Sequence, residues 1–184
     1  KEWFAERAPE IARASNAAKR RKMVATLKDS DPCLFASFLQ AQRQAEGVSH
    51  FLRHSLYLPL CGRGDVNTYA VFAELNAALI NARGRVGCIV PSGIATDDTT
   101  KQFFQWLVSD RRLSSLFDFE NRERTLFPEV YYRMRFCLLT ITGQSQTDDA
   151  AARFCFFVLR PEHLSDENRV FELTSREIRM LMPN

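Results

Sequence analysis

Apolar positions in the central part of the chain follow two alternating periods. Some stretches carry apolar side chains three and four residues apart, as one face of a helix does, and others are short apolar runs typical of strands. The predicted elements are a helix over 66–82, a strand over 86–90, a helix capped by Thr96 or Asp97, strands over 113–119, 136–142 and 154–159, an edge strand over 170–173 and a short helix capped by Ser175. This alternation of helices and strands predicts a wound α/β sheet, of which the chain holds one half. Ligands of such sheets bind beyond the carboxyl ends of the strands, so we expect function around residues 91–96 and 120–132.

Two packing expectations follow from these patterns. The helix over 66–82 has an apolar stripe that is expected to lie on the sheet. Its members are Tyr69, Phe72, Leu75, Asn76 and Leu79. The nearly unbroken run over 86–90 predicts a strand that is buried on both faces.

The amino-terminal part of the chain is predicted to be helical. Asn16 can cap a helix, and Asp31 begins a longer one that is expected to end or kink near Gly47. The basic run over 19–22 fits either a solvated helix face or a patch that contacts phosphates.

Length and composition indicate a folded chain. At 184 residues and 46% apolar content, it can bury a real core. It begins at Lys1 rather than at a methionine, so we expect it to be a part of a larger protein. The expected segments are a helical lead-in over 1–62, the α/β part over 63–160 and a carboxyl-terminal extension over 161–184.

Cysteine usage and hydropathy predict the compartment. The five cysteines are an odd number without a paired short spacing, and Cys88, Cys137 and Cys155 lie in apolar runs where a thiol acts as a small hydrophobe. We therefore expect a reducing, cytoplasmic setting. No apolar run approaches the roughly 18 residues of a membrane helix, so no membrane partner is expected.

No complete catalytic set can be assembled from the sequence. It has neither a Ser-His-Asp arrangement nor a phosphate-cradling glycine loop. His50 and His54 share the spacing of one helix face, but no nearby cysteine pair or carboxylate completes four zinc ligands, so no metal site is predicted. The formal net charge of +3 is too mild to establish a nucleic-acid partner.

The informative signal lies in three stretches taken together. They are Asn67-Thr-Tyr-Ala-Val-Phe-Ala-Glu74, Gly84-Arg-Val-Gly-Cys-Ile-Val-Pro-Ser92, and Leu126-Phe-Pro-Glu-Val130 leading into Phe136-Cys-Leu-Leu-Thr140. In combination they resemble the amino-methylating DNA methyltransferases, specifically the large adenine-N6 enzymes of restriction–modification and related phage-defence systems. The resemblance implies that the α/β part is the carboxyl-side half of a partial Rossmann-like methyltransferase sheet.

The same resemblance implies a cofactor and a substrate. S-adenosylmethionine would donate a methyl group to the N6 amine of a flipped adenine in double-stranded DNA. In the family, the Tyr-x-x-Phe helix lies beside this cofactor, and the motif match assigns that role to Phe72, with Tyr69 beside it. Because Phe72 is also in phase with Leu75 and Leu79, a purely structural core aromatic is the alternative.

A second role falls on Phe127. The family's Phe-Pro loop stacks an aromatic ring on the flipped base, which replaces the stacking lost when the base leaves the duplex. The matching loop also holds Arg122, Arg124 and Arg133, which we expect to contact nucleic acid. Alternatively, Phe127 packs beneath the loop and the arginines are solvated.

Two family motifs are absent. The cofactor-binding glycine loop and the Asn/Asp-Pro-Pro-aromatic tetrapeptide are expected upstream of Lys1. We therefore expect no catalytic residue in this chain, no activity of the isolated chain, and the missing amino-side half as a partner, with residues 161–184 leading toward a target-recognition region. A non-catalytic nucleic-acid-binding module and a helical interaction domain are the alternatives.

Overall fold

The computed structural model describes residues 1–144, 146–147 and 150–181. The chain divides into two compact units, Lys1–Phe51 and Leu52–Asn184. Each unit has its own hydrophobic cluster and is described separately.

The first unit is helical, as predicted. Its helices are α1 (Glu2–Ala5), α2 (Pro9–Ala12), α3 (Ala17–Ser30) and the start of α4 (Pro32–His54). The Asn16 side chain accepts a hydrogen bond from the Lys19 backbone N–H at 2.8 Å, which confirms the predicted cap. The predicted end or kink near Gly47 is wrong, because α4 continues through it to His54. A glycine costs an exposed helix only about 1 kcal/mol, which helix-forming neighbours can offset.

The second unit contains the sheet. Its elements are α5 (Thr68–Leu79), β1 (Arg85–Pro91), α6 (Gly93–Thr96), η1 (Asp98–Thr100), α7 (Lys101–Ser109), β2 (Leu113–Glu120), η2 (Asn121–Glu123), β3 (Arg135–Thr142), β4 (Ala151–Val158), η3 (Pro161–Ser165), β5 (Phe171–Thr174) and α8 (Ser175–Leu181). The order of helices and strands predicted from the apolar periods is confirmed.

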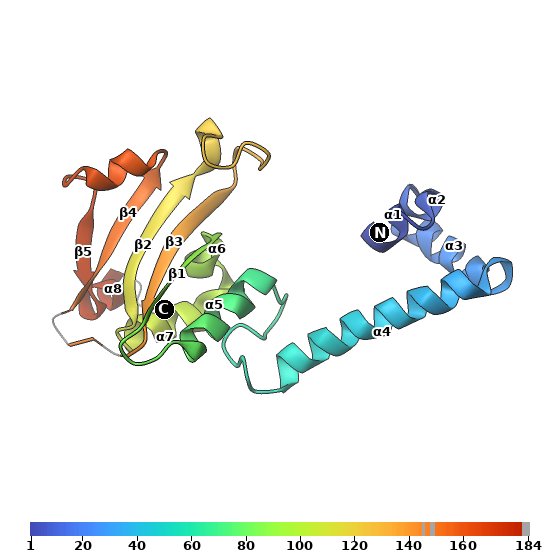
Figure 1. Ribbon diagram of the computed structural model, residues 1–184, viewed down its shortest axis with the longest axis horizontal. Helices are drawn as coiled ribbons and strands as arrows, with labels where there is room; N and C mark the ends of the chain where they lie inside the picture. Colours follow the sequence, from blue (N-terminus) through green and yellow to red (C-terminus); the bar gives the residue numbers. More distant parts are fainter. Residues whose placement is uncertain (145, 148–149, 182–184) are drawn as a thin grey trace. The chain divides into compact units, whose positions relative to one another are not determined.

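The sheet has the strand order β1-β3-β2-β4-β5 (Figure 1). β3 is antiparallel to both β1 and β2, β2 is parallel to β4, and β5 is antiparallel to β4. β1, β2 and β4 therefore run in one direction, and their carboxyl ends, at Pro91, Glu120 and Val158, meet at one edge of the sheet together with the start of β3. We call this edge the carboxyl edge.

The main core lies between one face of the sheet and the helices. Leu116, Leu139 and Ile141 point from the strands toward Phe103 and Leu107 of α7, and all five side chains are buried. Alternate strand residues form a smaller cluster on the opposite face, around Phe119, Cys155 and Val158. The described helices thus cover one face of the sheet far more completely than the other.

The buried cysteines behave as the sequence predicts. Cys137 and Cys155 are fully buried within strands, and all five cysteines are free thiols. Burial, with a smaller contribution from the nearby Asp118 carboxylate, raises the pKa of the Cys137 thiol to about 12. A thiol with such a pKa stays neutral and packs as an apolar group.

The predicted packing stripe of α5 is wrong for Phe72 and Leu79, although Tyr69 packs against the core as predicted. The helix buries Ala70, Ala73 and Ala77 against the core, whereas Phe72 is 59% exposed and Leu79 is 73% exposed. Small alanine side chains let the helix axis approach the sheet closely, and this close approach decides which face turns inward. Phe72 and Leu79 are therefore left on the surface of the unit, whereas Val71 is buried and Tyr69 packs against the core.

The prediction that β1 is buried on both faces is also wrong. Its side chains alternate: Val90 is buried, but Ile89 is 60% exposed and both Arg85 and Gly87 are exposed. The reason is its position, because among the described residues β1 is the first strand of the sheet and pairs with β3 alone. An apolar run therefore forms an exposed edge strand here.

Among the described residues, no helix is both long enough and apolar enough to cross a membrane.

Candidate functional site

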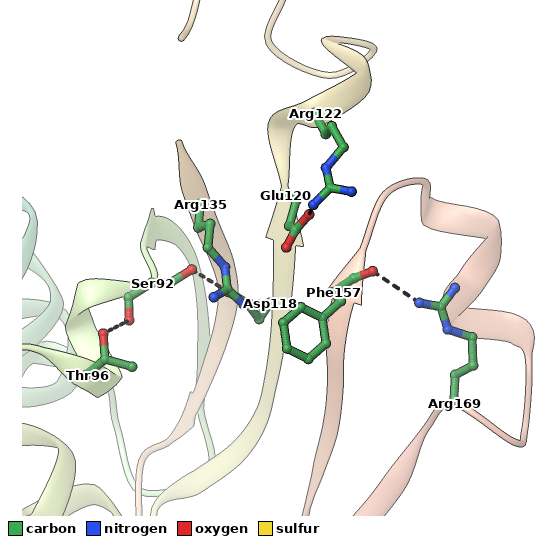
Figure 2. A network of polar contacts seen from close by, with 8 residues as sticks. All are labelled: Ser92, Thr96, Asp118, Glu120, Arg122, Arg135, Phe157 and Arg169. Carbon is green, nitrogen blue, oxygen red and sulfur yellow. Dashed lines mark hydrogen bonds and ion pairs between the residues drawn. The ribbon is translucent and has the colours of Figure 1, made fainter. Parts of the chain in front are cut away.

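A buried carboxylate organises the carboxyl edge of the sheet. Asp118, near the end of β2, is only 3% exposed. The Ser92 hydroxyl, just after β1, donates a hydrogen bond to one of its oxygens, and the Arg135 guanidinium, at the start of β3, forms an ion pair with the other (Figure 2). One side chain thus joins the ends of three adjacent strands, because a buried charge needs a partner for each of its oxygens.

Arg135 is held on two sides. Its guanidinium carbon lies 5.0 Å from the centre of the Phe157 ring at the end of β4, in addition to its pairing with Asp118. The Arg135 side chain nevertheless remains 44% exposed. Part of this fixed positive charge is therefore accessible to a ligand at the carboxyl edge.

The loop over 121–134 is anchored by a buried asparagine. The Asn121 side-chain amide donates hydrogen bonds to the carbonyl oxygens of Phe127 and Val130, at 2.9 and 3.0 Å. Its backbone N–H donates to the carbonyl oxygen of Met134 at 3.1 Å. Asn121 therefore closes the loop at both ends and sets the position of the residues between them.

Phe127 is half-buried at the base of this loop. Its ring meets the Phe136 ring edge to face, with 4.9 Å between the ring centres. This contact holds the ring at the base of the loop while part of it stays exposed.

The loop arginines gather around Tyr132. Arg124 and Arg133 place their guanidinium carbons 5.9 and 5.4 Å from the Tyr132 ring centre. Arg122 instead pairs with the Glu120 carboxylate at 2.8 Å. A cleft of about 260 Å³ is lined by Glu120, Arg122, Tyr132, Arg133 and Arg135. Two of the predicted nucleic-acid contacts, Arg122 and Arg133, thus share one cleft with Arg135. The sequence did not predict Arg135 as a site residue.

The predicted cofactor residues lie elsewhere, on α5. The Tyr69 hydroxyl is hydrogen-bonded to the Asp97 carboxylate, and burial together with this charge raises the tyrosine pKa above its usual value. Asp97 also fills the space beside Gly93, where an added Cβ would lie 2.2 Å from a carboxylate oxygen. The exposed Phe72 ring follows one helical turn later. The hydrogen bond to Asp97 fixes Tyr69 next to the Ser92-Gly93 turn after β1. Phe72 faces outward.

Sequence reasoning missed Ser92, Asp118, Arg135 and Phe157 as members of one network. A signal for Asp118 exists in the strand pattern, because it shares its strand face with the buried Leu116 and a carboxylate at such a position needs partners. No comparable signal marks Phe157, whose position depends on how β2 and β4 pair.

Within residues 1–144, 146–147 and 150–181, no group of three or more His, Cys, Asp or Glu side chains is arranged to hold a metal ion.

The comparisons support the fold. No family model and no curated protein matches the chain. Among solved structures, the chain is similar to the type IIG restriction endonuclease BpuSI, with a TM-score of 0.51 and 17% sequence identity over 73% of this chain. The chain spans only 18% of the length of that protein. The chain described here thus has a mixed α/β fold with a five-stranded, partial Rossmann-like sheet of the methyltransferase type.

Proposed function

We propose that the chain is the carboxyl-side part of a methyltransferase domain in a restriction–modification or phage-defence enzyme that methylates the N6 amine of adenine in DNA. The observation that carries this proposal is the sheet, in which antiparallel β3 lies between parallel β1 and β2, in a chain whose fold is similar to that of a type IIG restriction enzyme. The sequence resemblance to adenine-N6 methyltransferases supplies the reaction and the cofactor.

The missing amino-side half is the first proposed partner. β1 has an unpaired outer edge, and the exposed Leu79 and Ile89 place apolar surface on α5 and on β1 itself. Exposed edge strands and apolar patches are sites where another chain segment adds to a sheet. We propose that the half carrying the glycine loop and the Asn/Asp-Pro-Pro-aromatic tetrapeptide pairs with β1, so the isolated chain is inactive.

S-adenosylmethionine is the proposed cofactor, and it supplies the methyl group. The residues present fit one wall of its site, because the Phe72 ring is exposed and can offer a flat apolar face to an adenine ring. Tyr69 keeps this helix in place through its hydrogen bond to Asp97. Both residues would bind and orient the cofactor, and neither would handle a proton.

Phe127 is the proposed stacking partner of the flipped adenine. Its edge-to-face contact with Phe136 contributes about 0.5–1.5 kcal/mol, whereas stacking on a base contributes about 1–3 kcal/mol. A flipped base can therefore compete successfully for this ring. Arg122, Arg124 and Arg133 would contact the phosphates of double-stranded DNA from the same loop.

The decisive experiment reconstitutes the domain. We expect the 184-residue chain combined with its amino-side half to transfer labelled methyl groups from S-adenosylmethionine to adenine in duplex DNA, and the chain alone to transfer none. In the reconstituted domain, Phe127→Ala should weaken binding or turnover about 5- to 150-fold, the equivalent of about 1–3 kcal/mol of base stacking. Phe171→Ala is the matched control, because Phe171 is an aromatic residue exposed on β5.

Three results would contradict these assignments. Turnover by the isolated chain would exclude the division into two halves. Unchanged turnover and unchanged fluorescence of a reporter target base in Phe127→Ala would exclude the stacking role. Absence of methyl transfer from the reconstituted domain would exclude the proposed reaction.

Such an enzyme would act on DNA in the cytoplasm, and five free thiols fit a reducing compartment.

A non-catalytic nucleic-acid-binding module is the second candidate. It is favoured by Arg124 and Arg133, whose guanidinium groups both lie near the Tyr132 ring. Among the described residues, neither arginine forms an ion pair with a carboxylate. A titration with salt separates the two candidates. A steep loss of DNA affinity with salt, without methyl transfer after reconstitution, would favour the binding module.

A further inference from the structure

Phe157 is an exposed aromatic residue for which the proposed methyl transfer has no use. Its ring is 60% exposed, and its backbone φ of 56° lies in the left-handed region that disfavours bulky side chains. Residues persist in such conformations only where the surrounding structure imposes them, and they are frequent at ligand sites. The structure around Phe157 therefore holds this residue in its left-handed conformation.

A β-bulge places this residue at the carboxyl edge. Phe117 of β2 pairs with Cys155 of β4, and Phe119 pairs with Val158. Asp118 of β2 consequently lies opposite two residues of β4 rather than one. Bulges of this kind redirect a side chain and are common next to active sites. Here the bulge turns the phenylalanine ring toward the network built on the buried carboxylate.

Two arginines hold Phe157 in place. The Arg135 guanidinium lies against the ring at 5.0 Å and is itself fixed by Asp118. The Arg169 guanidinium donates a hydrogen bond to the Phe157 carbonyl oxygen at 3.1 Å, as Figure 2 shows. Arg135 occupies part of the ring surface, and more than half of the side chain remains open. The result is a pre-positioned aromatic surface, which loses little conformational freedom when it binds a ligand.

Arg135 connects this ring to the cleft described above. The cleft is lined by the guanidinium groups of Arg122, Arg133 and Arg135 and by one carboxylate, that of Glu120. Planar guanidinium groups bind phosphate oxygens with paired hydrogen bonds. An aromatic face beside such a cleft is the arrangement that binds a nucleotide through its base and its phosphate together.

We propose that Phe157 and this cleft form a subsite for one unpaired DNA nucleotide, whose base stacks on Phe157 and whose phosphate contacts Arg122 and Arg133. DNA as the ligand rests on the proposed function. The nucleotide is not the flipped adenine, because Arg135 and Phe136 are consecutive strand residues that point to opposite faces of the sheet. Phe157 contacts Arg135, whereas Phe127 contacts Phe136.

The test measures binding of a short fluorescent single-stranded oligonucleotide to the 184-residue chain by anisotropy at low salt. Phe157→Gly removes the ring while glycine accepts the left-handed backbone without strain, so the variant is expected to fold. We expect it to bind about 5- to 150-fold more weakly, as loss of one base stack predicts. Phe171→Leu, at another exposed aromatic position of the same sheet, should change affinity less than about twofold.

Salt dependence tests the phosphate part of the subsite. Arg133→Gln should reduce the slope of log affinity against log salt by about 0.7, the value for one phosphate contact on a single strand. Arg83→Gln is the matched control, because Arg83 is exposed just before the start of β1. The start of β1 lies at the end of the strand away from the carboxyl edge. An unchanged slope in Arg133→Gln would overturn the phosphate contact.

The remaining outcomes separate this inference from the proposed function. Equal affinity of Phe157→Gly and the wild-type chain, or no binding of single-stranded DNA by the wild-type chain, would overturn the subsite. An RNA oligonucleotide bound as tightly as DNA, and equally sensitive to Phe157→Gly, would overturn the assignment to DNA. Phe157-dependent DNA binding without methyl transfer by the reconstituted domain would overturn the proposed reaction and support the subsite.

Discussion

The second unit exposes two surfaces whose chemistry is opposite. The carboxyl edge is polar and basic, and its exposed arginines and aromatics are fixed by the buried Asp118 and Asn121. The second surface, which we call the β1 flank, consists of the outer edge of β1 with the exposed side chains of Ile89 and Leu79. It combines these two exposed apolar side chains with the free backbone groups of an edge strand. The first surface suits a charged polymer, and the second suits another part of a protein sheet.

The difference shows that exposure alone does not identify a binding site. On the carboxyl edge, side chains are exposed although specific contacts hold them, which indicates a surface that is already organised for its ligand. On the β1 flank, side chains are exposed because the sheet stops there, which indicates a surface that is incomplete. Four predictions can break or sharpen this comparison.

The largest effect is expected on the β1 flank. The double substitution of Leu79→Asp with Ile89→Thr should weaken association with the amino-side half by about 3 kcal/mol, more than 100-fold, because two apolar side chains lose their burial. Stability of the chain itself should change by less than about 0.5 kcal/mol per site, since both side chains are exposed. Isothermal calorimetry and urea unfolding measure these two quantities.

Met180→Asp is the matched control for that substitution, because Met180 is an exposed apolar residue on α8. Equal loss of association in the control would mean that the β1 flank is not the specific contact.

The next effect concerns the foundation of the carboxyl edge. Asp118→Ala should lower the free energy of unfolding by about 2 kcal/mol, because Ser92 loses a hydrogen-bond partner and Arg135 loses its buried counter-ion. The expected loss is below that of a fully buried pair, since Arg135 can be solvated. Urea unfolding of Asp118→Ala is compared with Asp29→Ala on an exposed helix position. Equal stability of the two variants would show that the network does not support the edge.

A smaller effect is expected for Tyr132. Tyr132→Ala removes the ring shared by Arg124 and Arg133, and exposed cation–π contacts contribute about 0.5–1 kcal/mol each. The loop over 121–134 should exchange its amide hydrogens faster, while global stability stays nearly constant. Tyr132→Phe should retain the wild-type exchange rates. If Leu126→Ala, at another exposed apolar position of the same loop, accelerates exchange equally, the shared ring is not what orders the arginines.

The smallest effect is a pH dependence at the same edge. A hydrogen bond from Arg160 at 2.6 Å, helped by its charge, lowers the pKa of Glu123 below the usual 4.5. A depressed carboxylate pKa stabilises the fold above the unfolded pKa, and this stabilisation is lost as pH falls through the folded pKa. Wild type should therefore be slightly more stable than Glu123→Gln at neutral pH, and the difference should vanish in acid. A difference that persists in acid would contradict this ion pair.

Local patterns predicted the elements well, because a helix or a strand depends mainly on the residues within it. The cap at Asn16 and the strands β1 to β5 follow from spacing that can be read within one short window. The packing faces were predicted less well. Phe72 and Leu79 of the predicted α5 stripe point outward, and alanines of the helix pack instead, because the distance between helix and sheet is set by both partners.

The candidate site also has residues that single segments of sequence suggested and residues that only the pairing of strands brought to it. Motifs assigned candidate roles to Phe72, Phe127 and the loop arginines, and the structure adds that Arg122 and Arg133 share a cleft. Phe157 could not be identified, since an extra residue in β4 is visible only when β4 is paired with β2. A bulge is a property of two strands, and the sequence of either strand alone does not contain it.

The sequence by itself therefore determined the α/β character of the chain, the order of its elements and the residues on which its resemblance to methyltransferases rests. These depend on periods and motifs within single segments. Only the tertiary structure decided that β1 is an edge strand, that α5 leaves Phe72 and Leu79 exposed, and that Asp118 joins three strand ends beneath a basic and aromatic edge. These depend on which segments become neighbours, and pairing and close packing between distant segments fix that choice.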